Sequence, residues 1–305
     1  MGIIRLKPVP NYKLDHHIKK IRTFLDAGDF LHAFQLIKSS ELEFSGEFRV
    51  TELLIECYIQ QGKLRLAHET YLEYLDVNPD DEWVTLAYGR FLFHQKKWNK
   101  ARKVFRSLGV SRYPNLALLS GYCSFRAGNL AAAKKYFEYY IKRNEEKGIH
   151  SVAYYYLSLI YAKTGMHHEA VPLIESLADL FHGNPRVARL LTYVYMKCDM
   201  AEHALRASKI ALTLLPENKK MLALAITVLL HCKEGAAALK AIEKYETLLK
   251  ETNTAAKFKI SFWKADAYLH ARKYAYARRK YLEILADEPY NAKAKYALEI
   301  IAKKY

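Results

Sequence analysis

The sequence has no run of 18 or more apolar residues and few cysteines, prolines or glycines for its length. The missing apolar run predicts that no helix crosses a membrane. The four cysteines are far apart in sequence, and none occurs in a CxxC or Cys/His ligand spacing. We therefore expect buried small side chains rather than metal ligands, in a reducing compartment such as the cytoplasm. These residues are Cys57, Cys123, Cys198 and Cys232.

The short motifs of common enzyme sites are also missing. The chain contains no GxSxG, HExxH, GxxxxGK[ST] or GxGxxG. Its adjacent histidine pairs, His16-His17 and His167-His168, would point about 100° apart on a helix, which makes them poor joint metal ligands. We predict a non-catalytic protein with no catalytic residue, no metal site and no cofactor, and we expect these histidines at the surface.

The first ten residues, MGIIRLKPVP, contain no apolar core long enough for a signal peptide. Leu6 stands where a myristoylation motif has Ser or Thr, so the Met1-Gly2 start does not complete that motif. With Pro8 and Pro10, this stretch is expected to form an extended segment before the first helix.

Acidic residues are the scarcer charged class. The chain has 48 Lys and Arg against 32 Asp and Glu, which gives a formal net charge of +16, and it contains 24 tyrosines.

One small residue recurs along most of the chain, at successive spacings of 34, 34, 32, 37, 34, 34 and 39 residues. The series consists of Ala33, Ala67, Ala101, Ala133, Ala170, Ala204, Ala238 and Ala277. Five residues before each alanine stands an expected turn residue, and four of the eight are glycine, which tolerates the positive φ that ends a helix tightly. The turn residues are Gly28, Gly62, Lys96, Gly128, Gly165, Asp199, Lys233 and Arg272.

The position twelve residues before each alanine is expected to face a partner helix. Glycine occupies it twice, as Gly89 and Gly121, and glycine is costly in a lone helix, so we predict a close approach of two helices at both points. Prolines close several of the repeats, as at Pro79, Pro216 and Pro289.

This pattern resembles the tetratricopeptide repeat, a helix–turn–helix unit of about 34 residues. The resemblance covers roughly residues 14–290 and implies an all-α, right-handed superhelical solenoid of about eight hairpins, numbered here one to eight. After Pro289, a lone helix starting at an Asn291 cap would cover the open end. The domain prediction is an extension at 1–12, hairpins one to four at 13–147, hairpins five to eight at 148–290, and a capping helix at 291–305.

Helix boundaries follow from the same repeat. The expected pairs are 14–27 with 30–39, 48–61 with 64–77, 81–95 with 98–108, 115–127 with 130–145, 150–164 with 167–182, 185–198 with 201–214, 219–232 with 235–250, and 257–271 with 274–286. Extra residues fall at 143–150 and 250–257. We expect a flexible joint at the first and a loop at the second, and both should be early sites of proteolysis.

The resemblance also implies which positions of each first helix face the concave surface of the solenoid. In hairpins three to six these positions carry basic and aromatic residues and no acid. We predict a groove that binds a protein or peptide through an acidic or amphipathic segment, because arginine pairs bidentately with carboxylates and tyrosine gives contact area. Its residues are Arg90, Phe93, His94, Tyr122, Phe125, Arg126, Tyr155, Lys163, Arg186, Arg189, Tyr193 and Lys197.

Three functions are compatible with this groove. The first is a scaffold, adaptor or chaperone-like interaction module. The second is a basic solenoid that binds nucleic acid, because lysine and arginine also cluster outside the groove, for example over residues 96–106. The third is a regulatory protein that responds to a peptide. Salt-dependent binding to mixed RNA or DNA would favour the second.

Overall fold

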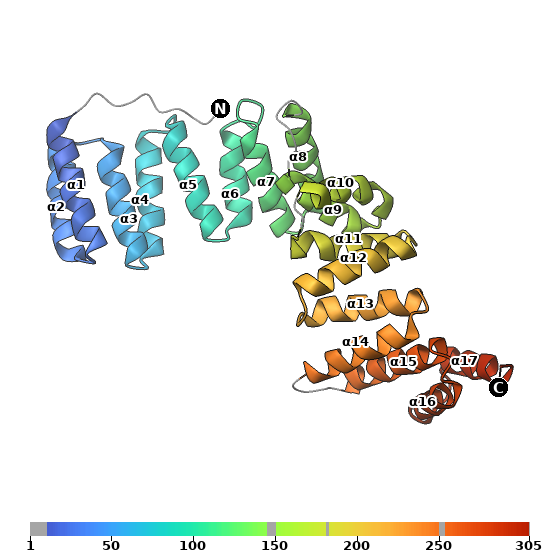
Figure 1. Ribbon diagram of the computed structural model, residues 1–305. Helices are drawn as coiled ribbons and strands as arrows, with labels where there is room; N and C mark the ends of the chain where they lie inside the picture. Colours follow the sequence, from blue (N-terminus) through green and yellow to red (C-terminus); the bar gives the residue numbers. More distant parts are fainter. Residues whose placement is uncertain (1–10, 145–150, 181–182, 250–253, 305) are drawn as a thin grey trace. The chain divides into compact units, whose positions relative to one another are not determined.

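The computed structural model describes residues 11–144, 151–180, 183–249 and 254–304, and within these ranges every regular element is a helix (Figure 1). The helices are α1 (Tyr12–Asp26), α2 (Phe30–Glu43), α3 (Phe48–Gln60), α4 (Leu64–Val77), α5 (Glu82–His94), α6 (Trp98–Ser107), α7 (Asn115–Arg126), α8 (Leu130–Arg143), α9 (Ser151–Thr164), α10 (His167–Leu180), α11 (Pro185–Lys197), α12 (Ala201–Leu214), α13 (Lys219–His231), α14 (Gly235–Thr247), α15 (Thr254–His270), α16 (Tyr274–Asp287) and α17 (Ala292–Ala302). The all-α prediction is therefore confirmed.

The helices pair in chain order into eight hairpins, α1–α2 to α15–α16, and α17 follows the last. The chain divides into two compact units, residues 1–149 with α1–α8 and residues 150–305 with α9–α17, and each is described by itself. Within each unit every helix packs against the next, and first helices of neighbouring hairpins also meet, as α1 meets α3 and α11 meets α13. This arrangement confirms the solenoid of hairpins with a C-terminal helix.

The repeating alanines lie where the two helices of each hairpin cross. All eight are at most 1% exposed. The position twelve residues earlier is buried in every hairpin as well. A Cβ atom added at Gly89 would lie 2.6 Å from Phe105 Cε1, and one at Gly121 would lie 2.9 Å from Phe137 Cε1. The predicted close approach is confirmed, because a phenyl ring of the second helix fills the space beside each glycine.

Hydroxyl residues occupy this crossing position in hairpins five and six. Ser158 Oγ donates to the carbonyl of Tyr154, and Thr192 Oγ1 donates to the carbonyl of Ala188, both at 2.8 Å. Each buried hydroxyl is therefore satisfied within its own helix and leaves no unpaired polar group in the crossing.

The eight turn residues all adopt the left-handed conformation. The four glycines have φ between 72° and 83°, and the four non-glycine residues Lys96, Asp199, Lys233 and Arg272 have φ between 57° and 60°. A residue with a Cβ pays about 1–2 kcal/mol for this conformation, so the packing on both sides enforces it.

The helix ends lie within two residues of the expected ones except at three places, one of which is the end of α14, at Thr247 instead of 250. Helix α2 runs to Glu43 instead of 39, because Ser40 is buried and its hydroxyl lies 2.9 Å from His17 Nδ1 on α1. Helix α15 begins at Thr254 instead of 257. The predicted cap at Asn291 is confirmed, since its Oδ1 accepts from the N–H of Ala294 at 3.1 Å.

Parts of three predictions lie outside the described residues. They are the extended segment before residue 11, the joint at 143–150, of which 145–150 are not described, and the loop at 250–257, of which 250–253 are not described. The domain boundaries stay a prediction.

Pro172 lies inside α10 and is exposed, so the carbonyl that loses its helical partner faces the solvent side of the helix.

Replacing a left-handed lysine or arginine with glycine is expected to stabilise the protein. Lys233→Gly and Arg272→Gly should each raise the free energy of unfolding by about 0.5–1 kcal/mol, since the relief of left-handed strain exceeds the added entropy of the unfolded chain. Denaturant unfolding measures the change. The control Gly62→Ala introduces the left-handed strain and should lower stability. A loss of stability in both Lys233→Gly and Arg272→Gly would contradict the turn geometry.

A charge at the helix crossing is expected to destabilise its hairpin. Ala204 is 1% exposed, so Ala204→Glu buries an unpaired carboxylate and should cost about 3 kcal/mol or more. Thermal unfolding of this variant is compared with Ala236→Glu, which places the same charge on an exposed position of α14. Equal melting temperatures for the two variants would show that the repeat alignment is wrong in hairpin six.

Candidate functional site

Three successive first helices of the C-terminal unit, α9, α11 and α13, line a pocket of about 440 Å³. We call it the basic pocket, and its lining residues are Tyr155, Leu159, Ala162, Lys163, Arg186, Arg189, Leu190, Tyr193, Lys220 and Leu224. Five of the six residues that the sequence predicted for the groove in this unit are among them. The structure thus brings Tyr155, Lys163, Arg186, Arg189 and Tyr193 together around one depression.

Helical periodicity explains why the α11 residues share the pocket. Arg186, Arg189, Leu190 and Tyr193 follow one another at i, i+3, i+4 and i+7, which places them on one face of the helix. Asn184 fixes the start of this helix, because its Oδ1 accepts from the N–H groups of Arg186 at 3.0 Å and Val187 at 3.3 Å. The first cation of the row is therefore held on a capped helix end.

No carboxylate is found among the described residues that line the basic pocket. The ion pairs in the described part of the C-terminal unit lie elsewhere, and none of them involves Arg186, Arg189 or Lys220. Cations that are gathered in one depression raise the local positive potential. The arrangement favours an anionic ligand.

Tyr193 is held from two sides at the edge of the basic pocket. Lys197 Nζ lies 5.9 Å from the centroid of its ring, and the His167 ring meets it edge-on at 6.0 Å between centroids. Lys197, the sixth predicted residue of this unit, thus rests against Tyr193 instead of lining the pocket. His167 is partly buried, with Nδ1 lacking a hydrogen-bond partner among the described residues, so the expected surface position holds only for its neighbour His168.

Sequence reasoning missed Lys220, Leu190 and Leu224 of the basic pocket. Lys220 occupies in hairpin seven the inward position that Arg186 occupies in hairpin six. The prediction covered hairpins three to six only, so one further hairpin would have included Lys220. The leucines Leu190 and Leu224 share another position of the repeat, which lies beside the inward ones.

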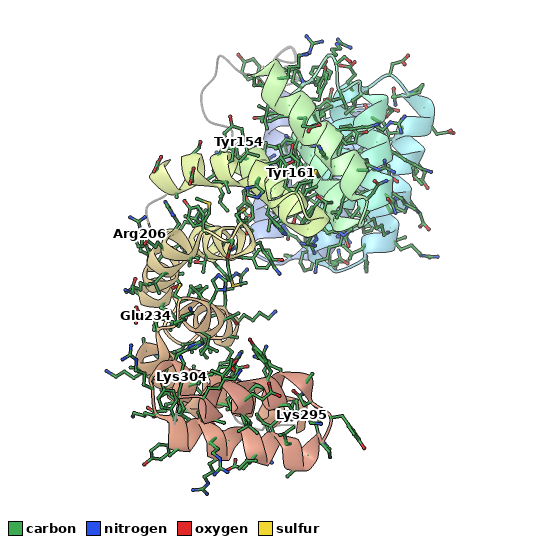
Figure 2. The ribbon with its side chains drawn as sticks, turned by 90° about the vertical axis from the view of Figure 1, so that its right-hand side faces the viewer. Tyr154, Tyr161, Arg206, Glu234, Lys295 and Lys304 are labelled. Atoms are coloured by element: carbon green, nitrogen blue, oxygen red, sulfur yellow. The ribbon has the colours of Figure 1, made fainter. Side chains whose placement is uncertain are left out.

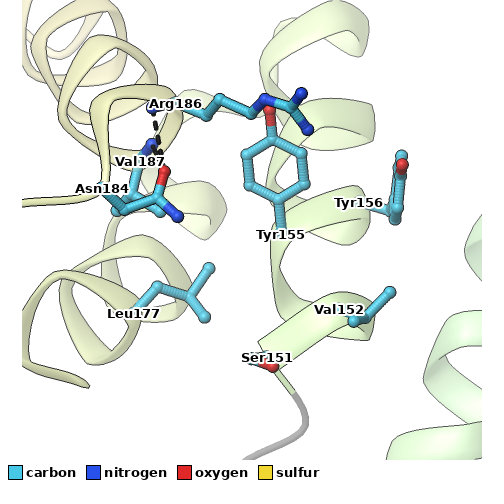
Figure 3. Close-up of a pocket in the computed structure, with 8 residues that line it drawn as sticks. All are labelled: Ser151, Val152, Tyr155, Tyr156, Leu177, Asn184, Arg186 and Val187. Carbon is cyan, nitrogen blue, oxygen red and sulfur yellow. Dashed lines mark hydrogen bonds between the residues drawn. The ribbon is translucent and has the colours of Figure 1, made fainter. Parts of the chain in front are cut away.

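A second, smaller pocket adjoins the basic pocket near the starts of α9 and α11. We call it the apolar pocket; its volume is about 280 Å³, and it is lined by Ser151, Val152, Tyr155, Tyr156, Leu177, Asn184, Arg186 and Val187 (Figure 3). Leu177 comes from α10 and is buried, whereas Val152 is 49% exposed. Tyr155 and Arg186 line both pockets, so the two lie next to each other.

In the N-terminal unit, Arg90 and His94 line a pocket of about 350 Å³ together with Trp83 and Tyr71. Glu52 of α3 lines it too, so the depression carries both signs of charge. Hairpins three to six have no acid at the inward positions, but Glu52 belongs to hairpin two and brings a carboxylate into the pocket of Arg90.

Phe93, Tyr122 and Arg126 form a cluster with Trp98, the first residue of α6. The ring centroids of Phe93 lie 5.4 Å from Trp98 and 5.2 Å from Tyr122. The Arg126 guanidinium lies 5.1 Å from the Trp98 centroid, and Arg126 Nη1 donates to Tyr122 Oη at 3.2 Å. Cation–π contact thus fixes Arg126 on an aromatic platform. Phe125 is partly buried and lines neither described pocket.

The twelve predicted groove residues are therefore split equally between the two units. In the N-terminal unit all but Phe125 belong to a mixed-charge pocket or an aromatic cluster, and in the C-terminal unit all but Lys197 line the basic pocket. Exposed charges also stand on the outside of the C-terminal unit, as Arg206, Glu234 and Lys295 do (Figure 2). The assignment of the groove to a partner stays a prediction.

The cysteines are free and separate into two classes. Cys57 and Cys123 are fully buried, as expected. Cys198 and Cys232 are only half-buried, because each lies just beyond the end of its helix at the C-cap. Among the described residues no three His, Cys, Asp or Glu side chains are grouped to hold a metal, and no helix there is long and apolar enough to cross a membrane.

Alkylation of the native protein is expected to distinguish these classes. Burial raises the pKa of the Cys123 thiol from 9.0 to about 12, and its thiolate fraction at pH 8 falls about a thousandfold. With iodoacetamide at pH 8, Cys198 and Cys232 should be modified first, and Cys57 and Cys123 only after unfolding. Peptide mass spectrometry measures the order, and early modification of Cys123 would contradict its burial.

Comparison with known proteins supports the repeat pattern. A family model described as tetratricopeptide repeat matches residues 57–114, which include α4, α5 and α6. No curated protein matches the chain in sequence at a significant level.

Solved structures show the same fold. A tetratricopeptide repeat protein from Parabacteroides merdae is 15% identical with a TM-score of 0.54, and the alignment covers 83% of this chain and 98% of that one. MamA from Desulfovibrio magneticus is 17% identical with a TM-score of 0.52 over 55% of this chain and 95% of its own. PilF from Pseudomonas aeruginosa is 19% identical with a TM-score of 0.50 over 67% and 92%. These structural similarities establish the architecture, but at such low identities they do not indicate which ligand the chain binds.

Proposed function

We propose that the chain, whose repeats and fold match those of tetratricopeptide-repeat proteins, is a non-catalytic interaction module that holds an extended acidic segment of a partner protein in the basic pocket. The fold is generally a scaffold for protein interactions. The observation that carries the proposal is the gathering of Lys163, Arg186, Arg189 and Lys220 around one depression with no carboxylate among its described lining residues.

The chemistry of the lining suits a polypeptide carboxylate. Arg186 and Arg189 each present a planar fork that pairs bidentately with Asp or Glu, and Lys220 adds a point charge from the next hairpin. Tyr155 and Tyr193 supply contact area and a hydroxyl each, as aromatic residues do in protein interfaces. An extended acidic segment would meet both kinds of group along three helices.

We assign the N-terminal unit a supporting contact surface made of Phe93, Trp98, Tyr122 and Arg126. Stacking on Trp98 orients the Arg126 guanidinium while its remaining N–H donors stay available on an exposed side chain. This unit also contains Glu52 beside Arg90, which disfavours a uniformly acidic ligand there. The basic pocket is therefore the main site, and the four free thiols suit a cytoplasmic protein.

Binding of a defined acidic peptide tests the proposal. The probe is a fluorescein-labelled peptide, GSEEDEEDSG, and anisotropy is measured on the full chain. The pocket variant Arg186→Glu, Arg189→Glu, Lys220→Glu reverses three lining charges. It should weaken binding about 30-fold or more, because the cations that would pair with the carboxylates of the peptide are replaced by anions.

The matched control is Lys209→Glu, Lys240→Glu, Lys244→Glu, which changes the formal charge equally on exposed positions of α12 and α14. It should alter affinity less than about threefold, since exposed distant charges are screened by salt. Equal losses in both variants, or tighter binding of a labelled ten-nucleotide oligothymidylate than of the peptide, would refute the proposal and support the nucleic-acid alternative.

A further inference from the structure

The apolar pocket lies beside the proposed acidic-segment site but has different chemistry. Val152, Leu177 and Val187 give it an aliphatic wall, and Tyr155 and Tyr156 add aromatic rings. In Figure 3, Leu177 and Val187 stand on the opposite side of the pocket from Val152 and Tyr156. Its volume of about 280 Å³ is below the roughly 300–1,000 Å³ typical of small-molecule sites. The space fits one aromatic or branched aliphatic side chain.

Arg186 and Tyr155 lie at the boundary between the two pockets. Both residues line each pocket, and in Figure 3 the Arg186 side chain extends toward the hydroxyl end of the Tyr155 ring. A ligand that fills the apolar pocket would therefore meet a guanidinium at its exit. From that point Arg189 and Lys220 continue the row of cations on the basic side.

We propose that the partner segment is bipartite: a large apolar side chain enters the apolar pocket while carboxylates of the same segment lie in the basic pocket. This inference rests on the function proposed above and adds the sequence feature that the partner must carry. It follows from the adjacency of an aliphatic and a cationic pocket that share two lining residues.

The geometry of α9 sets the spacing within the segment. Val152 lines the apolar pocket and Leu159 the basic pocket, seven residues apart on one face of the helix. Seven residues of α-helix rise about 10 Å, and an extended chain covers that distance in about three residues. The apolar side chain and the centre of the acidic run should therefore be separated by about three residues.

The distribution of charge favours a polypeptide over a nucleic acid. A nucleobase in the apolar pocket would be flanked by phosphates on both sides, yet Arg186 is the only cation among the described residues that line this pocket. Lys163, Arg189 and Lys220 all lie on the basic-pocket side. A peptide can place charge on one side of an apolar residue only, which matches this asymmetry.

Three labelled peptides of equal length and charge test the proposal on the full chain. All carry the run EEDE; one has Trp three residues before the centre of the run, one has Trp three residues after it, and the third has Ala at both positions. One of the two Trp peptides should bind about 10- to 100-fold tighter than the Ala peptide, as burial of an aromatic side chain provides.

Val152→Asn tests the location without changing net charge. Val152 is exposed near the start of α9, so the fold should tolerate the change, and the Trp advantage should fall to about threefold or less while the Ala peptide binds as before. Val77→Asn, on exposed α4 of the other unit, should leave the advantage intact. Arg189→Ala should weaken all peptides by a similar factor.

The outcomes separate the two proposals. If the acidic peptides bind and lose affinity in the pocket variant, but Trp and Ala peptides bind equally, the bipartite segment is refuted and the proposed function stands. A Trp advantage that survives Val152→Asn would place the apolar side chain elsewhere and refute the inference. Binding of none of the peptides would refute both proposals, and tighter binding of the oligothymidylate would identify a nucleic-acid ligand instead.

Discussion

Close contact at the crossing of the two helices in each hairpin is the constraint on which the whole structure depends. The second helix always presents a buried alanine there, and the first helix presents Gly, Ala, Ser, Thr or Ile. The volume of one partner compensates for the other, since Phe105 and Phe137 fill the space beside Gly89 and Gly121. Once the crossing is fixed, the turn must reverse the chain within a few residues, and the left-handed φ of all eight turn residues follows.

The same constraint determines which faces remain for binding. The first helix of a hairpin packs one face against its own second helix and another face against the neighbouring hairpins. The residues of the first helix that make neither contact therefore recur at fixed positions of the repeat. Arg186 and Lys220 occupy the same position in successive hairpins and therefore meet at one pocket. Repetition of the scaffold thus converts a sequence periodicity into a cluster of like charges, and folding energy from the crossings offsets their repulsion.

Most of the fold could be predicted from sequence because its signals are local. A small residue at nearly constant spacing, turn glycines and capping residues such as Asn291 each act within one or two turns of helix. The site was only partly predictable. Five residues of the basic pocket followed from the repeat, as did the inward position of Glu52, but the placement of Arg126 on Trp98 depends on contacts between elements that no periodicity encodes. The half-burial of Cys198 and Cys232 has another cause: each cysteine lies one residue past the end of its helix, where its side chain is more exposed than within the helix.

Two inward-facing arginines, one in each unit, show why the fold alone does not select a ligand. Arg90 and Arg189 both lie on first helices and face pockets of similar size, about 350 and 440 Å³. Glu52 shares the pocket of Arg90, whereas the described lining around Arg189 contains only cations, aromatic rings and aliphatic side chains. One carboxylate supplied by a neighbouring helix thus reduces the positive potential of the first pocket, whereas no carboxylate is among the described lining residues of the second, as our proposal of an acidic ligand requires. Proteins with this architecture share only 15–19% identity with the chain, so the same fold accommodates very different side chains, and we expect the side chains at inward-facing positions to determine the partner.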